Sequence, residues 1–122
     1  IIAGIADGQP KLYETDPSGT PYEWKALAVG ADRGETREYL EENYEEEMSL
    51  DASVELALSS LASVNDDSLS PEGLGLATVS VEDEQFHEHD IDEREAYLEQ
   101  FELLASEDEE TDEDAVEDDA DE

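Results

Sequence analysis

Residues 1–30 read IIAGIADGQPKLYETDPSGTPYEWKALAVG, a series of short apolar or alternating runs separated by turn residues. The first run, residues 1–6, is continuously apolar and stops at the turn cluster DGQP. An alternating run at residues 11–15 follows and is broken by DPSG at residues 16–19. Proline fixes φ at the second position of such a turn, and glycine accepts a positive φ near its end. The pattern therefore predicts two strands, each followed by a tight turn.

Residues 22–30 predict a third strand, because this run is rich in aromatic and apolar residues and ends at a glycine. Side chains alternate along a strand, so Ala26, Ala28 and Gly30 share one face, which another layer of the structure can approach closely. The first strand is apolar on both faces, and we therefore expect its sheet to be covered on both sides.

After residue 30 the hydrophobic period changes from two to 3.6, which indicates helices. Residues 36–47 predict an exposed amphipathic helix with Leu40 and Tyr44 on its apolar face. Ser49 is a favourable N-cap for a second helix. The expected apolar face of that helix consists of Leu50, Val54, Leu58 and Leu61.

The remainder of the chain predicts a hairpin and a last helix. Residues 74–81 form the expected strand, and residues 85–90 are its expected partner. Asp92 and Glu95 have capping-box spacing at the start of a helix over residues 91–105. The predicted order is thus strands, two helices, a hairpin and a helix, which is a fold of the α+β class.

The chain is strongly acidic, with 39 acidic and 5 basic residues and a formal net charge of −34. It has no basic patch to neutralise phosphates, which disfavours nucleic acid as a partner. We interpret the lysine-poor surface as typical of a cytosol that holds molar salt, where a Debye length of about 3 Å screens self-repulsion. Residues 107–122 are mostly Asp and Glu, and we expect them to form a disordered acidic tail.

Several classes of protein are disfavoured by what the sequence lacks. It has no cysteine, so neither a disulfide framework nor a thiol nucleophile is possible. No run has the length and apolarity of a membrane span or a signal peptide, so a cytoplasmic protein without a membrane partner is expected. The sequence opens inside an apolar strand without an initiator Met, and we interpret it as the C-terminal part of a longer protein.

The order and spacing of the features in residues 1–30 resemble the proteasome subunit family. The shared pattern is an apolar strand, an Asp-Gly turn, an aromatic-acidic strand, Asp-Pro-Ser-Gly, and an aromatic pair before Lys-Ala-x-Ala-x-Gly. The resemblance continues to about residue 106, so residues 1–106 are expected to be the C-terminal part of a proteasome-type domain. It implies the C-terminal half of the four-layer α-β-β-α sandwich of N-terminal nucleophile hydrolases.

Within that family, the sequence is more similar to the non-catalytic α-type subunits of archaeal, halophilic proteasomes than to the catalytic β-type. The pair Trp24-Lys25 and the run EYLEENY at residues 38–44 resemble α-type patterns. The run GADR at residues 30–33 replaces the Gly-Ser-Gly-Ser turn that supports a β-type active site. A C-terminal helix followed by an acidic tail is also similar to α-type chains.

The resemblance implies a structural and regulatory function in intracellular protein degradation: ring assembly, substrate gating and regulator docking. The implied partners are other α subunits, β subunits and an ATPase regulator, while peptide hydrolysis belongs to the β partner. It assigns no catalytic, cofactor-binding or metal residue to residues 1–122. Two alternatives stay open: a β-type subunit whose N-terminal Thr precedes Ile1, and a free-standing acidic binding protein.

Two further features of the sequence could indicate a metal-binding or catalytic site: a pair of histidines and one serine. His87 and His89 lie two positions apart, so they share one face of the predicted hairpin strand and could act as two metal ligands. Two histidines without a third placed ligand do not make a zinc site, and we expect a solvated hairpin edge. Ser18 lies in a turn that lacks the Gly-x-Ser-x-Gly pattern of a nucleophile elbow, so we expect a turn residue.

Overall fold

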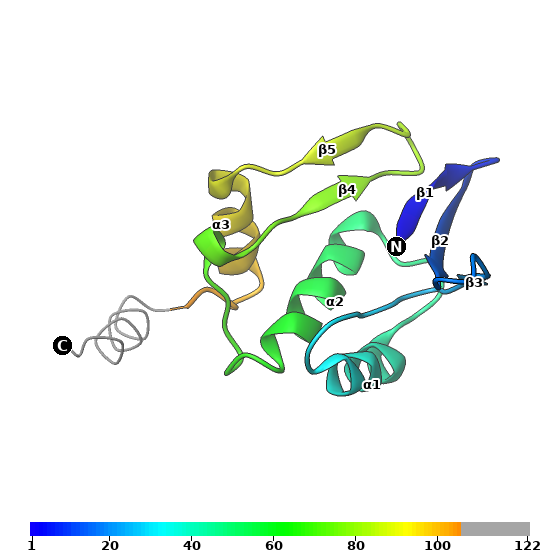
Figure 1. Ribbon diagram of the computed structural model, residues 1–122. Helices are drawn as coiled ribbons and strands as arrows, with labels where there is room; N and C mark the ends of the chain where they lie inside the picture. Colours follow the sequence, from blue (N-terminus) through cyan, green and yellow to red (C-terminus); the bar gives the residue numbers. More distant parts are fainter. Residues whose placement is uncertain (106–122) are drawn as a thin grey trace.

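The computed structural model describes residues 1–105, and the expected acidic tail at residues 107–122 lies outside this range. The order of elements agrees with the sequence prediction of strands, two helices, a hairpin and a helix (Figure 1). The elements are β1 (Ile2–Ala6), β2 (Gln9–Thr15), β3 (Pro21–Glu23), α1 (Arg33–Asn43), α2 (Leu50–Ala62), the short 3-10 helix η1 (Pro71–Gly73), β4 (Ala77–Val79), β5 (Phe86–Glu88) and α3 (Ile91–Gln100).

Strands β1, β2 and β3 form an antiparallel sheet in that order. The β1–β2 connection is a two-residue turn in which Asp7 and Gly8 both have positive φ, at 54° and 75°. Two positive φ angles give a turn whose twist matches that of the flanking strands, and Asp-Gly is a favoured pair for it. The Asp-Gly turn thus sets the register that pairs Ile2 with Tyr13.

The β2–β3 connection is organised by the carboxylate of Asp16. Its Oδ1 accepts hydrogen bonds from the backbone N–H groups of Ser18 (3.0 Å) and Thr20 (3.2 Å), and the Ser18 hydroxyl donates to the same oxygen. The backbone N–H of Gly19, which has φ of 87°, donates to the Asp16 carbonyl at 2.8 Å. The hydrogen bond from the Ser18 side chain, followed by those from the backbone, holds the pKa of Asp16 below its ordinary value of 3.8.

We expect the charge of Asp16 to stabilise this turn in a pH-dependent way. Because its pKa is lowered in the fold, the stabilisation is present above the ordinary pKa of 3.8 and is lost as the pH falls through the lowered value. The variant Asp16→Asn keeps a side-chain oxygen acceptor but removes the charge. It should be less stable than the wild type in urea unfolding at neutral pH, and the difference should vanish in acid. A difference that persists unchanged at a pH below the lowered pKa would contradict this role.

The predicted third strand, residues 22–30, is wrong in length, because β3 ends at Glu23. The β2–β3 register, in which Tyr13 pairs with Glu23, would next place Lys25 opposite Lys11. Like charges directly opposite each other destabilise a strand pair. The chain instead leaves the sheet toward α1, where Arg37 donates to the carbonyl of Ala28 at 2.9 Å and its guanidinium lies 5.4 Å from the centre of the Trp24 ring.

Helices α1 and α2 both differ in detail from the sequence prediction. Helix α1 covers residues 33–43 rather than 36–47, and its buried residues are Thr36 and Leu40. Helix α2 begins as predicted, since the Ser49 hydroxyl accepts a hydrogen bond from the Ala52 N–H at 3.1 Å. Its predicted apolar face is only partly buried. Val54 and Leu58 belong to the core, whereas Leu50 and Leu61 are 40% and 44% exposed.

The central hydrophobic core joins α2 to α3 and to the loop between α2 and η1. Its buried members are Val54, Leu58, Ala62, Leu69 and Leu98. The sequence predicted that the last helix ends at residue 105, but α3 ends at Gln100. The residues after it run beside the loop, where the Leu69 N–H donates to the Leu103 carbonyl at 2.7 Å. This backbone contact holds the end of the described chain against the core.

Strands β4 and β5 form a separate antiparallel hairpin, and a cleft of about 720 Å³ separates it from the three-stranded sheet. Residues on both sides line the cleft, including Ile5 of β1 and Thr78 of β4. The expected cover on both faces of the first strand is not present in the described residues, because Ile2 is 61% exposed. Within residues 1–105, no helix is both long enough and apolar enough to cross a bilayer.

Candidate functional site

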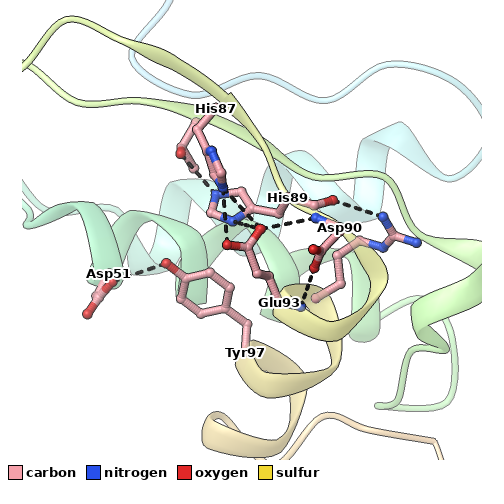
Figure 2. A network of polar contacts seen from close by, with 8 residues as sticks. Asp51, His87, His89, Asp90, Glu93 and Tyr97 are labelled. Carbon is pink, nitrogen blue, oxygen red and sulfur yellow. Dashed lines mark hydrogen bonds and ion pairs between the residues drawn. The ribbon is translucent and has the colours of Figure 1, made fainter.

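Three side chains with metal-ligating atoms meet where β5 leads into α3. They are His87, His89 and Glu93, and their ligand atoms all lie within 4.8 Å of one another (Figure 2). The His87 Nε2 atom lies 3.0 Å and 3.2 Å from the two carboxylate oxygens of Glu93. The His89 Nδ1 atom lies 3.4 Å from Glu93 Oε1. One carboxylate oxygen therefore faces a ring nitrogen of each histidine. We name these three residues the His-Glu cluster.

His89 is the buried member of the His-Glu cluster, with only 8% of its surface exposed. Its Nε2 atom is 3.0 Å from the hydroxyl oxygen of Thr78 on β4, which can accept a hydrogen bond from an Nε2–H group. That arrangement leaves a lone pair on Nδ1, on the side of the ring that faces Glu93. Among the described residues, Nδ1 is a buried nitrogen with no hydrogen-bond partner. Glu93 Oε1 lies 3.4 Å away without completing a hydrogen bond, and buried nitrogen atoms that lack one are uncommon, so this nitrogen is the unusual feature of the site.

Glu93 is held in place by the start of α3. Its backbone N–H donates to the Asp90 side chain at 2.9 Å, and its own Oε1 accepts from the Asp90 N–H at 3.1 Å. These reciprocal bonds form a capping box. The predicted capping box at Asp92 and Glu95 is therefore wrong by two residues. The hydrogen bond from His87, followed by that from the Asp90 backbone, lowers the pKa of Glu93 below its ordinary value.

Two further residues of α3, Tyr97 and Arg94, contact His89. The Tyr97 ring meets the His89 ring edge-on, with centroids 5.5 Å apart, and its hydroxyl lies 3.4 Å from Asp51 of α2. Burial, followed by the negative charge of Asp51, raises the pKa of Tyr97. Arg94 donates from Nη1 to the His89 carbonyl at 2.9 Å and from Nε to the Pro71 carbonyl at 3.0 Å. Arg94 thus ties the backbone of His89 to η1.

The geometry extends what the sequence indicated about this region. The prediction placed His87 and His89 on one face but found no third ligand, whereas the structure adds Glu93. The spacing His-x-His-x-x-x-Glu was the available signal, and its meaning depends on the helix starting at Ile91. Two imidazoles and a carboxylate form a donor set suited to a divalent transition metal.

Ser18 has a different role, because its hydroxyl donates to Asp16 within the β2–β3 turn. The two histidines of the chain both lie in the His-Glu cluster, at the end of the hairpin that leads into α3. Ser18 is therefore a turn residue in the described structure, as its sequence context predicts, and we assign it no chemical step.

The described residues form a domain of mixed helices and strands, with an antiparallel sheet, a second hairpin and packed helices. Residues 1–79 match the sequence profile of a family described as Proteasome subunit. This match covers more than half of the chain, and the chain belongs to the proteasome subunit family.

The individual relatives reported below are all named as α subunits of the proteasome. The chain is 62% identical over 121 residues to "Proteasome subunit alpha 1" of Haloarcula marismortui, covering 96% of this chain and 46% of that protein. It is 62% identical over 120 residues to "Proteasome subunit alpha" of Natronomonas pharaonis, covering 98% of this chain and 45% of that protein. A third relative, "Proteasome subunit alpha 1" of Haloferax volcanii, is 54% identical, with 90% of this chain and 44% of that protein covered.

These relatives are haloarchaeal proteins, which agrees with the interpretation of the acidic, lysine-poor composition as halophilic. The chain spans less than half the length of the three relatives.

Proposed function

We propose that the chain is part of a non-catalytic α-type subunit of the 20S proteasome core. In this role it serves ring assembly, substrate gating and regulator docking in protein degradation in the cytoplasm. The observation that carries the proposal is the 62% identity, over 96% of the chain, to a haloarchaeal protein named as a proteasome α subunit. The proposed partners are other α subunits, β subunits and an ATPase regulator.

The surface of the described residues supports a chain that assembles. Four large apolar side chains are more than half exposed: Ile1 (63%), Ile2 (61%), Val29 (54%) and Phe86 (69%). Side chains this exposed would be covered by other chains or segments in the assembly that we propose. In the described sheet, β1 and β3 each pair with β2 alone, so each has an open edge that further strands can extend.

The same observations support a finer proposal about the fold. The three-stranded sheet and the β4–β5 hairpin lie on opposite sides of one cleft, as the inner layers of a sandwich do. In this proposal helices α1, α2 and α3 would belong to an outer layer. We propose that residues 1–106 form the C-terminal half of a four-layer α-β-β-α sandwich, with residues 107–122 as an acidic extension.

The proposal places peptide bond hydrolysis in a β-type partner and assigns no catalytic residue to this chain. It predicts that the full-length subunit alone, in molar KCl, does not hydrolyse fluorogenic peptides. After addition of haloarchaeal β subunits, the mixture should hydrolyse the fluorogenic peptides. It should also degrade unfolded protein substrates. The β subunits alone provide the control. Hydrolysis by this subunit alone, lost after its N-terminal residue is blocked, would instead show a catalytic β-type chain. If this subunit does not change the peptide hydrolysis by the assembled β subunits, the chain is better explained as a free-standing acidic protein.

A further inference from the structure

We propose that the His-Glu cluster is a zinc site that fastens the β4–β5 hairpin to the start of α3. The ligand atoms are Nε2 of His87, Nδ1 of His89 and a carboxylate oxygen of Glu93. This inference rests on the geometry of the cluster and is independent of the proposed proteasome function.

Two of the three ligand–ligand distances in the cluster agree with tetrahedral coordination. Zinc binds imidazole nitrogen and carboxylate oxygen at about 2.0 Å, so neighbouring ligand atoms of a tetrahedron lie about 3.3 Å apart. The His87 Nε2–Glu93 Oε1 distance is 3.0 Å, and the His89 Nδ1–Glu93 Oε1 distance is 3.4 Å. The rings of the two histidines meet edge-on with centroids 4.3 Å apart. The remaining pair, His87 Nε2 and His89 Nδ1, lies within 4.8 Å, and zinc binding would require the half-exposed His87 side chain to rotate toward the third vertex.

The buried nitrogen of His89 distinguishes this cluster from an ordinary surface ion pair. Glu93 Oε1 lies 3.0 Å from His87 Nε2 and 3.4 Å from His89 Nδ1, yet Nδ1 stays buried without a hydrogen-bond partner. A metal ion at the centre of the cluster would use the lone pair of that nitrogen. Thr78 is the positioning residue: when its hydroxyl accepts a hydrogen bond from the Nε2–H group, His89 is in the tautomer in which Nδ1 can bind metal.

The donor set identifies the class of ion. Two neutral imidazoles and one carboxylate suit zinc and disfavour calcium and magnesium, which prefer oxygen ligands alone. His87 and Glu93 are half-exposed, at 54% and 44% of their side chains, so the fourth position faces solvent and takes water or chloride. Because the ligands come from β5, the residue after it and α3, zinc would cross-link the hairpin to the helix.

The test is zinc binding by the full-length chain, stripped with a chelator and titrated with zinc chloride in about 2 M KCl. High salt screens the many carboxylates, so diffuse uptake is suppressed. We expect one zinc per chain and a rise in melting temperature on binding. The variants His87→Gln and Glu93→Gln should bind more than about a hundredfold more weakly, and Thr78→Val about 10–100-fold more weakly. Glutamine at position 93 can still accept from the Asp90 N–H, so this variant preserves the capping box.

The matched control is Glu88→Gln, which removes one carboxylate from the same strand outside the cluster and should bind zinc as the wild type does. Equal zinc uptake by Glu88→Gln and Glu93→Gln, or no stoichiometric uptake by the wild type, would overturn the proposal. X-ray absorption at the zinc edge of the wild-type chain gives a readout that needs no variant. Two imidazole ligands are expected, and a shell of oxygen atoms alone would overturn the site.

Discussion

Replacing Leu58 with alanine is expected to lower the free energy of unfolding by about 2–5 kcal/mol. Leu58 is 1% exposed and is one of the two largest fully buried side chains, together with Leu98. It lies in the core between α2 and α3, where the loss of its methyl groups leaves a cavity that surrounding side chains fill only partly. The measurement is urea unfolding in molar KCl, because guanidinium is itself a salt and would alter the screening of the acidic surface.

The matched control is Leu61→Ala, three residues later on the same helix. The hydrophobic pattern alone places Leu58 and Leu61 on one face, but Leu61 is 44% exposed in the structure. Its truncation should cost less than about 1 kcal/mol, since little buried area is lost. Equal destabilisation by the two variants would contradict the packing of α2 described above.

Replacing Arg94 with methionine is expected to destabilise the fold by about 2–3 kcal/mol, because two charge-assisted hydrogen bonds are lost. The two acceptors are the carbonyl oxygens of Pro71 and His89, and both of these residues are buried. Methionine retains much of the apolar stem of arginine, so the variant chiefly tests the hydrogen bonds rather than the packing. Urea unfolding in molar KCl provides the free energy.

Arg33→Met is the control for the change in net charge, since Arg33 is an exposed residue in the first turn of α1. It should change the unfolding free energy by less than about 0.5 kcal/mol. A second variant, Arg94→Lys, retains the charge but cannot reach both carbonyl groups with the same fork of donors. Its free energy of unfolding should lie between those of the wild type and Arg94→Met. Arg94→Met with wild-type stability would show that these contacts do not hold η1 to α3.

The parts of the fold that follow from local chemistry could be predicted from the sequence. The Asp7-Gly8 turn, the Asp16 turn and the Ser49 cap each depend on residues within a few positions of one another. The length of β3 could not be predicted, because it depends on tertiary contacts. The apparent strand at residues 22–30 is interrupted where Lys25 would face Lys11 and where Arg37 of α1 binds the Ala28 carbonyl.

The candidate site was predictable only in part for the same reason. Alternation along a strand places His87 and His89 on one face, but it does not show that His89 becomes buried against Thr78 and Tyr97. Glu93 joins the histidines because Asp90, rather than Asp92, caps α3. A shift of two residues in the start of a helix turns a given side chain to another face, so this contact depends on the tertiary structure.

Electron microscopy of the full-length subunit, expressed alone in molar KCl, tests the proposal that this chain belongs to a proteasome α ring. We expect closed rings of identical subunits, because the chain is 62% identical to a protein named as a proteasome α subunit and closed symmetric rings are what a ring-forming subunit assembles into. A discrete monomer under the same conditions would rule out this role, and the similarity to proteasome α subunits would then concern the fold rather than the function.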